Sequence, residues 1–191
     1  MRHGVFLQFL KIFDIIYIEK IKKEVYEMAK LKGIKRVNRI INEFTAQFGI
    51  VAKFDTEFEA FCDDMTIGYT FLHTGKDDND FIEHAQERYP EVQADVFLWA
   101  FFHEIGHCMT EDMWTEEERD YFWKQKDVML EPALDRNYIN TWYYACPDEF
   151  FATRWAGEYM MNHPKKVAKF WNELQPAIMR FYRKNGLIEE N

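Results

Sequence analysis

The stretch DVFLWAFFHEIGHCMT, residues Asp95 to Thr110, decides the fold because a long apolar run ends in a short polar pattern. Asp95 is a favourable N-cap residue, and neither Pro nor another Gly interrupts the run before Gly106. A helix that is apolar on nearly all sides lies in the interior of a domain. We therefore predict a buried helix from about Gln93 to Thr110.

The segment His103-Glu104-Ile105-Gly106-His107 places two histidines on one face of that helix. Both imidazoles then reach one metal ion, and Glu104 points beside it, where a carboxylate can accept a proton from a metal-bound water. Two core histidines bonded to the backbone are the alternative, which we favour for a lone histidine but not for this pair with its glutamate. The pattern indicates a zinc hydrolase, with Glu104 as the catalytic base.

A catalytic zinc site usually takes three protein ligands, so two histidines are too few. One known pattern supplies a ligand six residues after the second histidine, but Met113 stands there. A helix predicted from Pro147 to near Asn162 carries Glu149, with Ala152 and Ala156 on the same face. These small alanines permit a close approach to the first helix.

We prefer Glu149 as the third ligand. The other carboxylates considered are Asp148, which ranks second, and then the more distant Glu111, Asp112 and Glu158. The competing interpretation is that Asp148 and Glu149 only stabilise the start of their helix, where negative charge is favourable.

The charge and the cysteines of the chain indicate which partners and which cellular location to expect. The chain has 191 residues, 33 acidic against 24 basic side chains and a net charge of -9, which argues against nucleic acid as the main partner. The three cysteines, Cys62, Cys108 and Cys146, are odd in number and widely spaced, so we expect no disulfide framework. Because no cleavable signal peptide is evident either, we expect a cytoplasmic protein. Cys108 follows His107 directly but points about 100° away, so we do not expect it to bind the same metal.

The N-terminal segment has an amphipathic pattern and precedes a second possible start at Met28. Val5 to Ile18 is apolar but broken by polar residues every three positions, which is an amphipathic pattern and not a membrane span. Lys23-Glu24-Val25 can be encoded by a ribosome-binding sequence at the usual distance before Met28. We therefore expect residues 1–27 to be either a non-native leader or an amphipathic helix.

The remaining segments predict an α+β fold, with a small sheet packed on the buried helix and on the helix that carries the third ligand. We expect one domain over residues 28–191, in which 165–191 form a helical extension. The other expected elements are a helix over 30–48, strands over 50–54 and 66–73, a short helix over 81–89, a helix start at Thr115, a loop over 127–141, and a last helix from Pro164 that breaks at Pro176 and ends at Asn185-Gly186.

The chain resembles the ImmA/IrrE-type metallopeptidases, which are compact gluzincin-like proteins of bacteria, phages and mobile elements. The resemblance rests on the His-Glu-Ile-Gly-His segment, on Glu149-x-x-Ala152-x-x-x-Ala156, and on Tyr159-Met160-Met161-x-x-Pro164. It implies a zincin-like fold with His103, His107 and Glu149 as zinc ligands and Glu104 as base. It also implies an intracellular role, often the cleavage of a repressor, in the host cytoplasm if the gene belongs to a phage. The gap from His107 to Glu149 is longer than expected for this family.

The expected reaction is peptide hydrolysis, with Glu104 moving a proton from water to the leaving amine. Candidates for a second donor to the oxyanion are Tyr143, Tyr144 and His73, although core packing or a place on the surface explains each of them better. The 66–73 strand at the edge of the cleft would bind the substrate by β-addition; core packing is the alternative explanation of this strand. Two rival functions stay open, namely a non-catalytic zinc protein that binds a host or phage regulator, and an enzyme for a non-protein amide.

Overall fold

The chain forms a mixed α+β structure, as the sequence predicts. A computed structural model describes residues 32–55, 57–71, 85–113, 115, 117–118 and 147–187. In chain order its elements are α2 (Ile34–Thr45), η1 (Ala46–Phe48), β1 (Val51–Phe54), β2 (Glu59–Phe61), η2 (Cys62–Asp64), β3 (Thr66–Tyr69), α4 (Val96–Thr110), η3 (Glu111–Met113), α7 (Pro147–Asn162) and α8 (Pro164–Lys184).

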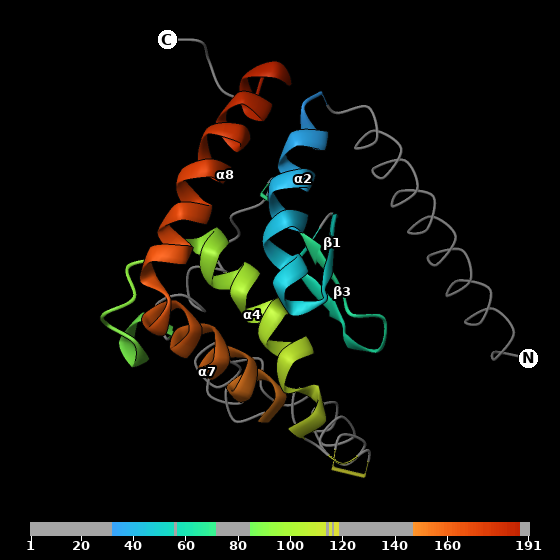
Figure 1. Ribbon diagram of the computed structural model, residues 1–191, viewed down its shortest axis with the longest axis vertical. Coiled ribbons are helices and arrows are strands. Elements are labelled where there is room, and N and C mark those ends of the chain that lie inside the picture. The colour runs from blue at the N-terminus through green and yellow to red at the C-terminus, as the bar shows by residue number, and fades with distance from the viewer. Residues whose placement is uncertain are drawn as a thin grey trace, which may run out of the picture.

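Helix α4 is the centre of the structure and is buried as predicted. The Asp95 carboxylate caps its start by accepting a hydrogen bond of 3.1 Å from the Leu98 N–H. Its side chains are buried around most of the helix, and Trp99, Phe101 and Phe102 are fully enclosed. In Figure 1 α4 runs obliquely through the middle of the molecule, and it contacts the sheet and α7. The motif at its C-terminal half is thereby held from several sides.

The sheet has the strand order β1-β3-β2, in which β3 runs parallel to β1 and antiparallel to β2. The predicted strand over 66–73 is therefore confirmed at its start, but the idea that it forms the edge of the cleft is wrong. Both sides of β3 are already paired, so its backbone has no free edge to offer a substrate. The strand that ends the sheet beside α4 is β2, which was not predicted.

Helices α2 and α8 lie side by side and antiparallel, and both cover the core (Figure 1). The Lys32 N–H at the start of α2 donates to Asn185 Oδ1, at the end of α8, over 3.0 Å. Further along, the rings of Phe44 and Phe170 stack with centroids 4.1 Å apart. The helix predicted over 30–48 is confirmed as α2 and η1, and Gly49 ends it with a positive φ of 74°.

The prediction that Pro176 breaks the last helix is wrong. Helix α8 runs without interruption from Pro164 to Lys184, with Pro176 exposed inside it. A proline inside a helix costs about 3 kcal/mol. Residues beyond it, Ala177, Ile178 and Phe181, are buried in the core, and their burial offsets that cost.

Several predictions fall on residues that the structure does not describe. They include the segment 1–27, the loop over 127–141, and most of the helices expected over 81–89 and from Thr115. Residues 85–88 are helical, and Thr115 and Glu118 form the expected capping box, with the Glu118 N–H donating to Thr115 Oγ1 over 3.2 Å. Among the described helices, none combines the length and the apolar character that crossing a bilayer requires.

Candidate metal centre

The site lies where α4 and α7 approach each other most closely. A Cβ atom added at Gly106 would lie 2.4 Å from the carbonyl oxygen of Ala152, so only glycine fits at this position of α4. Ala152 and Ala156 are fully buried on the facing side of α7. The predicted close approach is confirmed, and Gly106 contributes to it together with the alanines.

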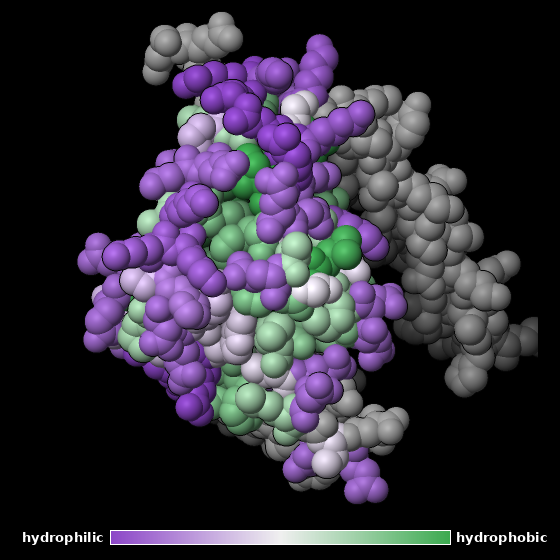
Figure 2. All heavy atoms as spheres, in the orientation of Figure 1, coloured by the Kyte–Doolittle hydropathy of each residue, from purple (hydrophilic) through white to green (hydrophobic). Residues whose placement is uncertain are grey.

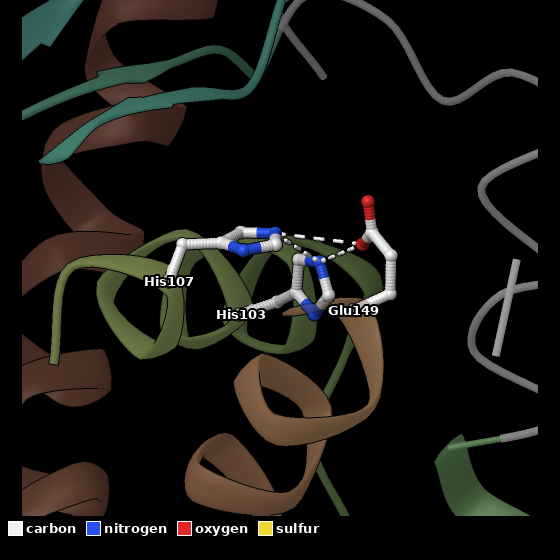
Figure 3. A group of neighbouring side chains, drawn as sticks. All are labelled: His103, His107 and Glu149. Carbon is white, nitrogen blue, oxygen red and sulfur yellow. Dashed lines mark hydrogen bonds and ion pairs between the residues drawn. The ribbon is translucent and has the colours of Figure 1, made fainter. Parts of the chain in front are cut away.

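The side chains of His103, His107 and Glu149 converge at this contact (Figure 3). His103 Nε2 lies 3.0 Å from Glu149 Oε2 and 3.0 Å from His107 Nε2. These three atoms form a triangle, whose third side, from His107 Nε2 to Glu149 Oε2, measures 3.4 Å. His103 and Glu149 are buried, while His107 retains some exposure.

This triangle has the size that a metal ion requires. In a tetrahedral site with metal–ligand distances of about 2.0–2.1 Å, neighbouring ligand atoms are about 3.3–3.4 Å apart. The three observed separations, 3.0, 3.0 and 3.4 Å, are close to that value without any rearrangement of the helices. Two imidazole nitrogens and one carboxylate oxygen on one side leave a fourth position for water or substrate. The described residues therefore include a group that could hold a metal ion.

Thr153 orients the first histidine, a role that the sequence analysis missed. Its Oγ1 lies 3.1 Å from His103 Nδ1, and its side chain is buried. If His103 Nε2 binds a metal, Nδ1 carries the proton and its N–H donates a hydrogen bond to Thr153 Oγ1, which orients the ring. The signal for this residue was its spacing, because Thr153 lies one helical turn after Glu149 on the same face of α7.

Without a metal, a proton holds the cluster together. Burial raises the pKa of Glu149, but hydrogen bonds from His103 and His107 outweigh this and bring the pKa well below its ordinary range. Burial alone would lower the pKa of His107, yet its bond to Glu149 and the charges of Glu149 and Glu104 raise that pKa to about 9. The metal-free site is thus arranged for a cation, and a proton on His107 provides one.

Glu104 lies beside this cluster and is not part of it. It is half-buried, and burial raises its pKa, an effect that the two histidines oppose and that the charges of Glu149 and Glu59 support. A raised pKa brings a carboxylate nearer to neutral pH, which suits a general base. Glu59 belongs to β2, which packs against α4.

The other candidate ligands lie outside the cluster. Asp148 is half-buried next to Glu149, and Asp112 is exposed in η3 together with the half-buried Glu111. Glu158 accepts a hydrogen bond of 2.7 Å from Arg154 one turn earlier in α7. Cys108 does not join the cluster, and the hydrogen bond of its thiol with Cys62 lowers the pKa of Cys108. Tyr143, Tyr144, His73 and Cys146 lie outside the described residues.

No protein-family model, curated protein or solved structure matches the chain.

Proposed function

We propose that the protein is a zinc-dependent metallopeptidase of zincin-like fold, related to the ImmA/IrrE type, that cleaves an intracellular regulatory protein. The observation that carries the proposal is the triangle of His103, His107 and Glu149, with Glu104 beside it on the same helix. Two imidazole nitrogens and one carboxylate oxygen are a set of donors that suits Zn²⁺, and three protein ligands would leave the open position that catalysis needs. A purely structural site has no use for an adjacent carboxylate base.

Each residue of the site would have its own role in the hydrolysis. His103, His107 and Glu149 would hold the zinc, which when bound lowers the pKa of a water molecule and polarises the substrate carbonyl. Glu104 accepts the proton from that water and returns it to the leaving amine. Thr153 keeps His103 in the tautomer that presents Nε2 to the site.

The substrate would approach along β2. This strand ends the described sheet and packs against α4, and Glu59 on it is close enough to influence the pKa of Glu104. An extended peptide paired with β2 would gain backbone hydrogen bonds and lie across the motif. This assigns to β2 the role that the sequence analysis gave to the 66–73 strand.

The proposal is tested with Glu104→Gln, which removes the base and keeps the shape of the side chain. We expect the variant to retain zinc, measured by elemental analysis of the purified protein, and to cleave a peptide library about 10²–10⁴-fold more slowly than wild type. Cleavage is read as new peptide termini by mass spectrometry. Equal cleavage by both proteins, or none by the zinc-loaded wild type, would defeat the enzymatic assignment.

Glu149→Ala tests the ligand set. Because loss of outer-shell partners alone weakens metal binding about 10–100-fold, loss of a ligand should weaken it more than about 100-fold. Asp148→Ala is the matched control, since it removes the neighbouring carboxylate, which is not in the cluster. If both variants bind zinc like wild type, Glu149 is not a ligand.

A further inference from the structure

The basic residues of this acidic chain are concentrated on α2, α8 and their flanking residues. Segment 32–48 carries Lys32, Lys35, Arg36 and Arg39, all exposed, and a single acidic residue, Glu43. Segment 164–187 carries six exposed basic residues, at positions 165, 166, 169, 180, 183 and 184, against Glu173 alone. The two segments thus hold ten basic and two acidic side chains in a chain of net charge -9.

Helix stability explains Arg183 and Lys184, which lie in the last turn of α8, but it does not explain the rest of this distribution. Carboxylates are favourable in the first turn of a helix and cations in the last, by about 0.3–1 kcal/mol each. Both α2 and α8 lack an acidic residue in the first turn. Instead, the first turn of α2 carries Lys35 and Arg36, and the first turn of α8 carries Lys165 and Lys166. At these positions a positive charge opposes the helix dipole. These cations are unfavourable for the helices by themselves, and a negatively charged partner would offset that cost.

A groove between the two helices has an apolar floor. It has a volume of about 400 Å³, with Ile40, Phe44 and Phe170 among its walls. Its polar walls include Lys166 and Lys169 from α8 and Glu43 from α2. Figure 2 shows apolar atoms in the gap between the hydrophilic side chains over α8 and those over α2. The groove therefore joins an apolar site to a basic surface.

We propose that the α2–α8 face binds an acidic amphipathic segment of another protein, as a helix laid in the groove. Its apolar side chains would fill the groove, and its carboxylates would pair with the lysines and arginines along both helices. A nucleic-acid backbone fits less well, because its phosphates gain nothing from the apolar floor of the groove. Helix α8 has 21 residues, so it supports a partner helix of up to about 30 Å.

This surface goes beyond the proposed peptidase function. None of the residues that line the groove belongs to α4 or α7, which hold the candidate metal ligands. Binding at the α2–α8 face therefore needs no metal. The metal-free protein and the Glu104→Gln variant should bind a partner as wild type does, so failure of one proposal leaves the other standing.

The experiment uses a fluorescein-labelled helical peptide of 20 residues, with leucines at positions i, i+3, i+4 and i+7 and glutamates elsewhere. Its control has the same composition in a scrambled order that removes the apolar stripe. We expect the full chain to bind the patterned peptide at least about tenfold more tightly than the scrambled one in fluorescence anisotropy. We also expect binding to weaken as salt rises, because rim charges are screened.

Two variants separate the charge from the groove. Lys166→Glu/Lys169→Glu reverses two rim charges and should weaken binding about tenfold or more. The matched control is Lys53→Glu, a reversal at an exposed lysine of β1, which should change affinity less than about twofold. Gln47→Trp puts a large side chain into the groove without a change of charge and should weaken binding as well. Circular dichroism checks that each variant is folded.

The proposal is overturned if the patterned and scrambled peptides bind equally. It is also overturned if a 20-bp DNA duplex, or vesicles of phosphatidylcholine with phosphatidylserine, bind more tightly than the patterned peptide. Binding that neither the double charge reversal nor Gln47→Trp weakens would have the same consequence. Self-association of the chain that these variants abolish, without peptide binding, would assign the face to a second copy instead.

Discussion

Replacing Gly106 with alanine should damage the metal site more than the fold. The added Cβ would lie 2.4 Å from the Ala152 carbonyl oxygen and 2.9 Å from two further backbone atoms of Ala152, whereas ordinary contact begins near 3.4 Å. These atoms belong to the backbone of α7, which cannot turn aside as a flexible side chain can. To relieve the contact, α4 and α7 must separate by about 1 Å at this point.

The substitution should affect the free energy of unfolding less than the zinc affinity, because core packing tolerates a displacement better than metal–ligand distances do. Overpacking a core costs about 1–3 kcal/mol, while alanine in place of glycine inside a helix returns about 1 kcal/mol. The net loss in the free energy of unfolding should therefore be about 0–2 kcal/mol. Metal–ligand distances tolerate only about ±0.2 Å, so a separation of 1 Å should move Glu149 out of reach and weaken zinc binding at least about 100-fold.

The assay compares zinc affinity by competition with a chromophoric chelator and stability by denaturation of the metal-free protein. Gly157→Ala is the matched control, because it lies in α7 and its Cβ would meet the ring of Tyr89 at 2.5 Å. That ring is only half-buried and can move, so we expect lower stability but a zinc affinity within about threefold of wild type. If Gly106→Ala binds zinc as tightly as wild type, the contact of Gly106 with the Ala152 backbone does not position Glu149, and the reasoning is refuted.

Further predictions concern single groups. Zinc binding at pH 7 should release about one proton from His107, whose pKa is about 9 without metal, as calorimetry in buffers of different ionisation enthalpy would show. The pKa of His107 in the metal-free protein lies above the unfolded value of about 6.5, so protonation of His107 should stabilise the metal-free fold by about 3 kcal/mol. This contribution is complete below pH 6.5 and is lost as the pH rises through 9. A free energy of unfolding that stays constant between pH 6 and 10 would contradict this. Thr153→Val should weaken zinc binding about 10–100-fold and Thr153→Ser should restore it. Pro176→Ala should raise the free energy of unfolding by about 1–3 kcal/mol, measured by urea denaturation, and no gain would mean that α8 is not strained there.

The sequence was informative where the pattern was local and periodic. Helix α4 was predicted because its apolar run, its N-cap and its histidine spacing all depend on one helical repeat. The start of α7 was equally clear from Pro147, and Glu149 could be chosen as the residue that the structure brings to the histidines because its face also carries small residues. The zinc, the base and the reaction remain proposals.

The sequence was less informative where the outcome depends on contacts between distant segments. Strand β2 has three residues, too few for an alternating pattern, and it exists because β3 pairs with it. Pro176 alone predicts a break, and only the buried residues on both sides of it show why α8 continues. The concentration of basic residues on α2 and α8 was hidden by the net charge of -9, because these helices are far apart in the chain.

The separation of the histidines from Glu149 along the chain sets the time at which the candidate metal site is complete during synthesis. His103 and Glu149 are 46 residues apart, and Glu149 comes later. At a synthesis rate of about 5–20 residues per second, the histidine pair leaves the ribosome about 2–9 s before the residue that completes the triangle. During that interval two imidazoles alone bind metal weakly and with little selectivity. A metal that uses all three ligands can therefore be bound only after Glu149 of α7 has been synthesised.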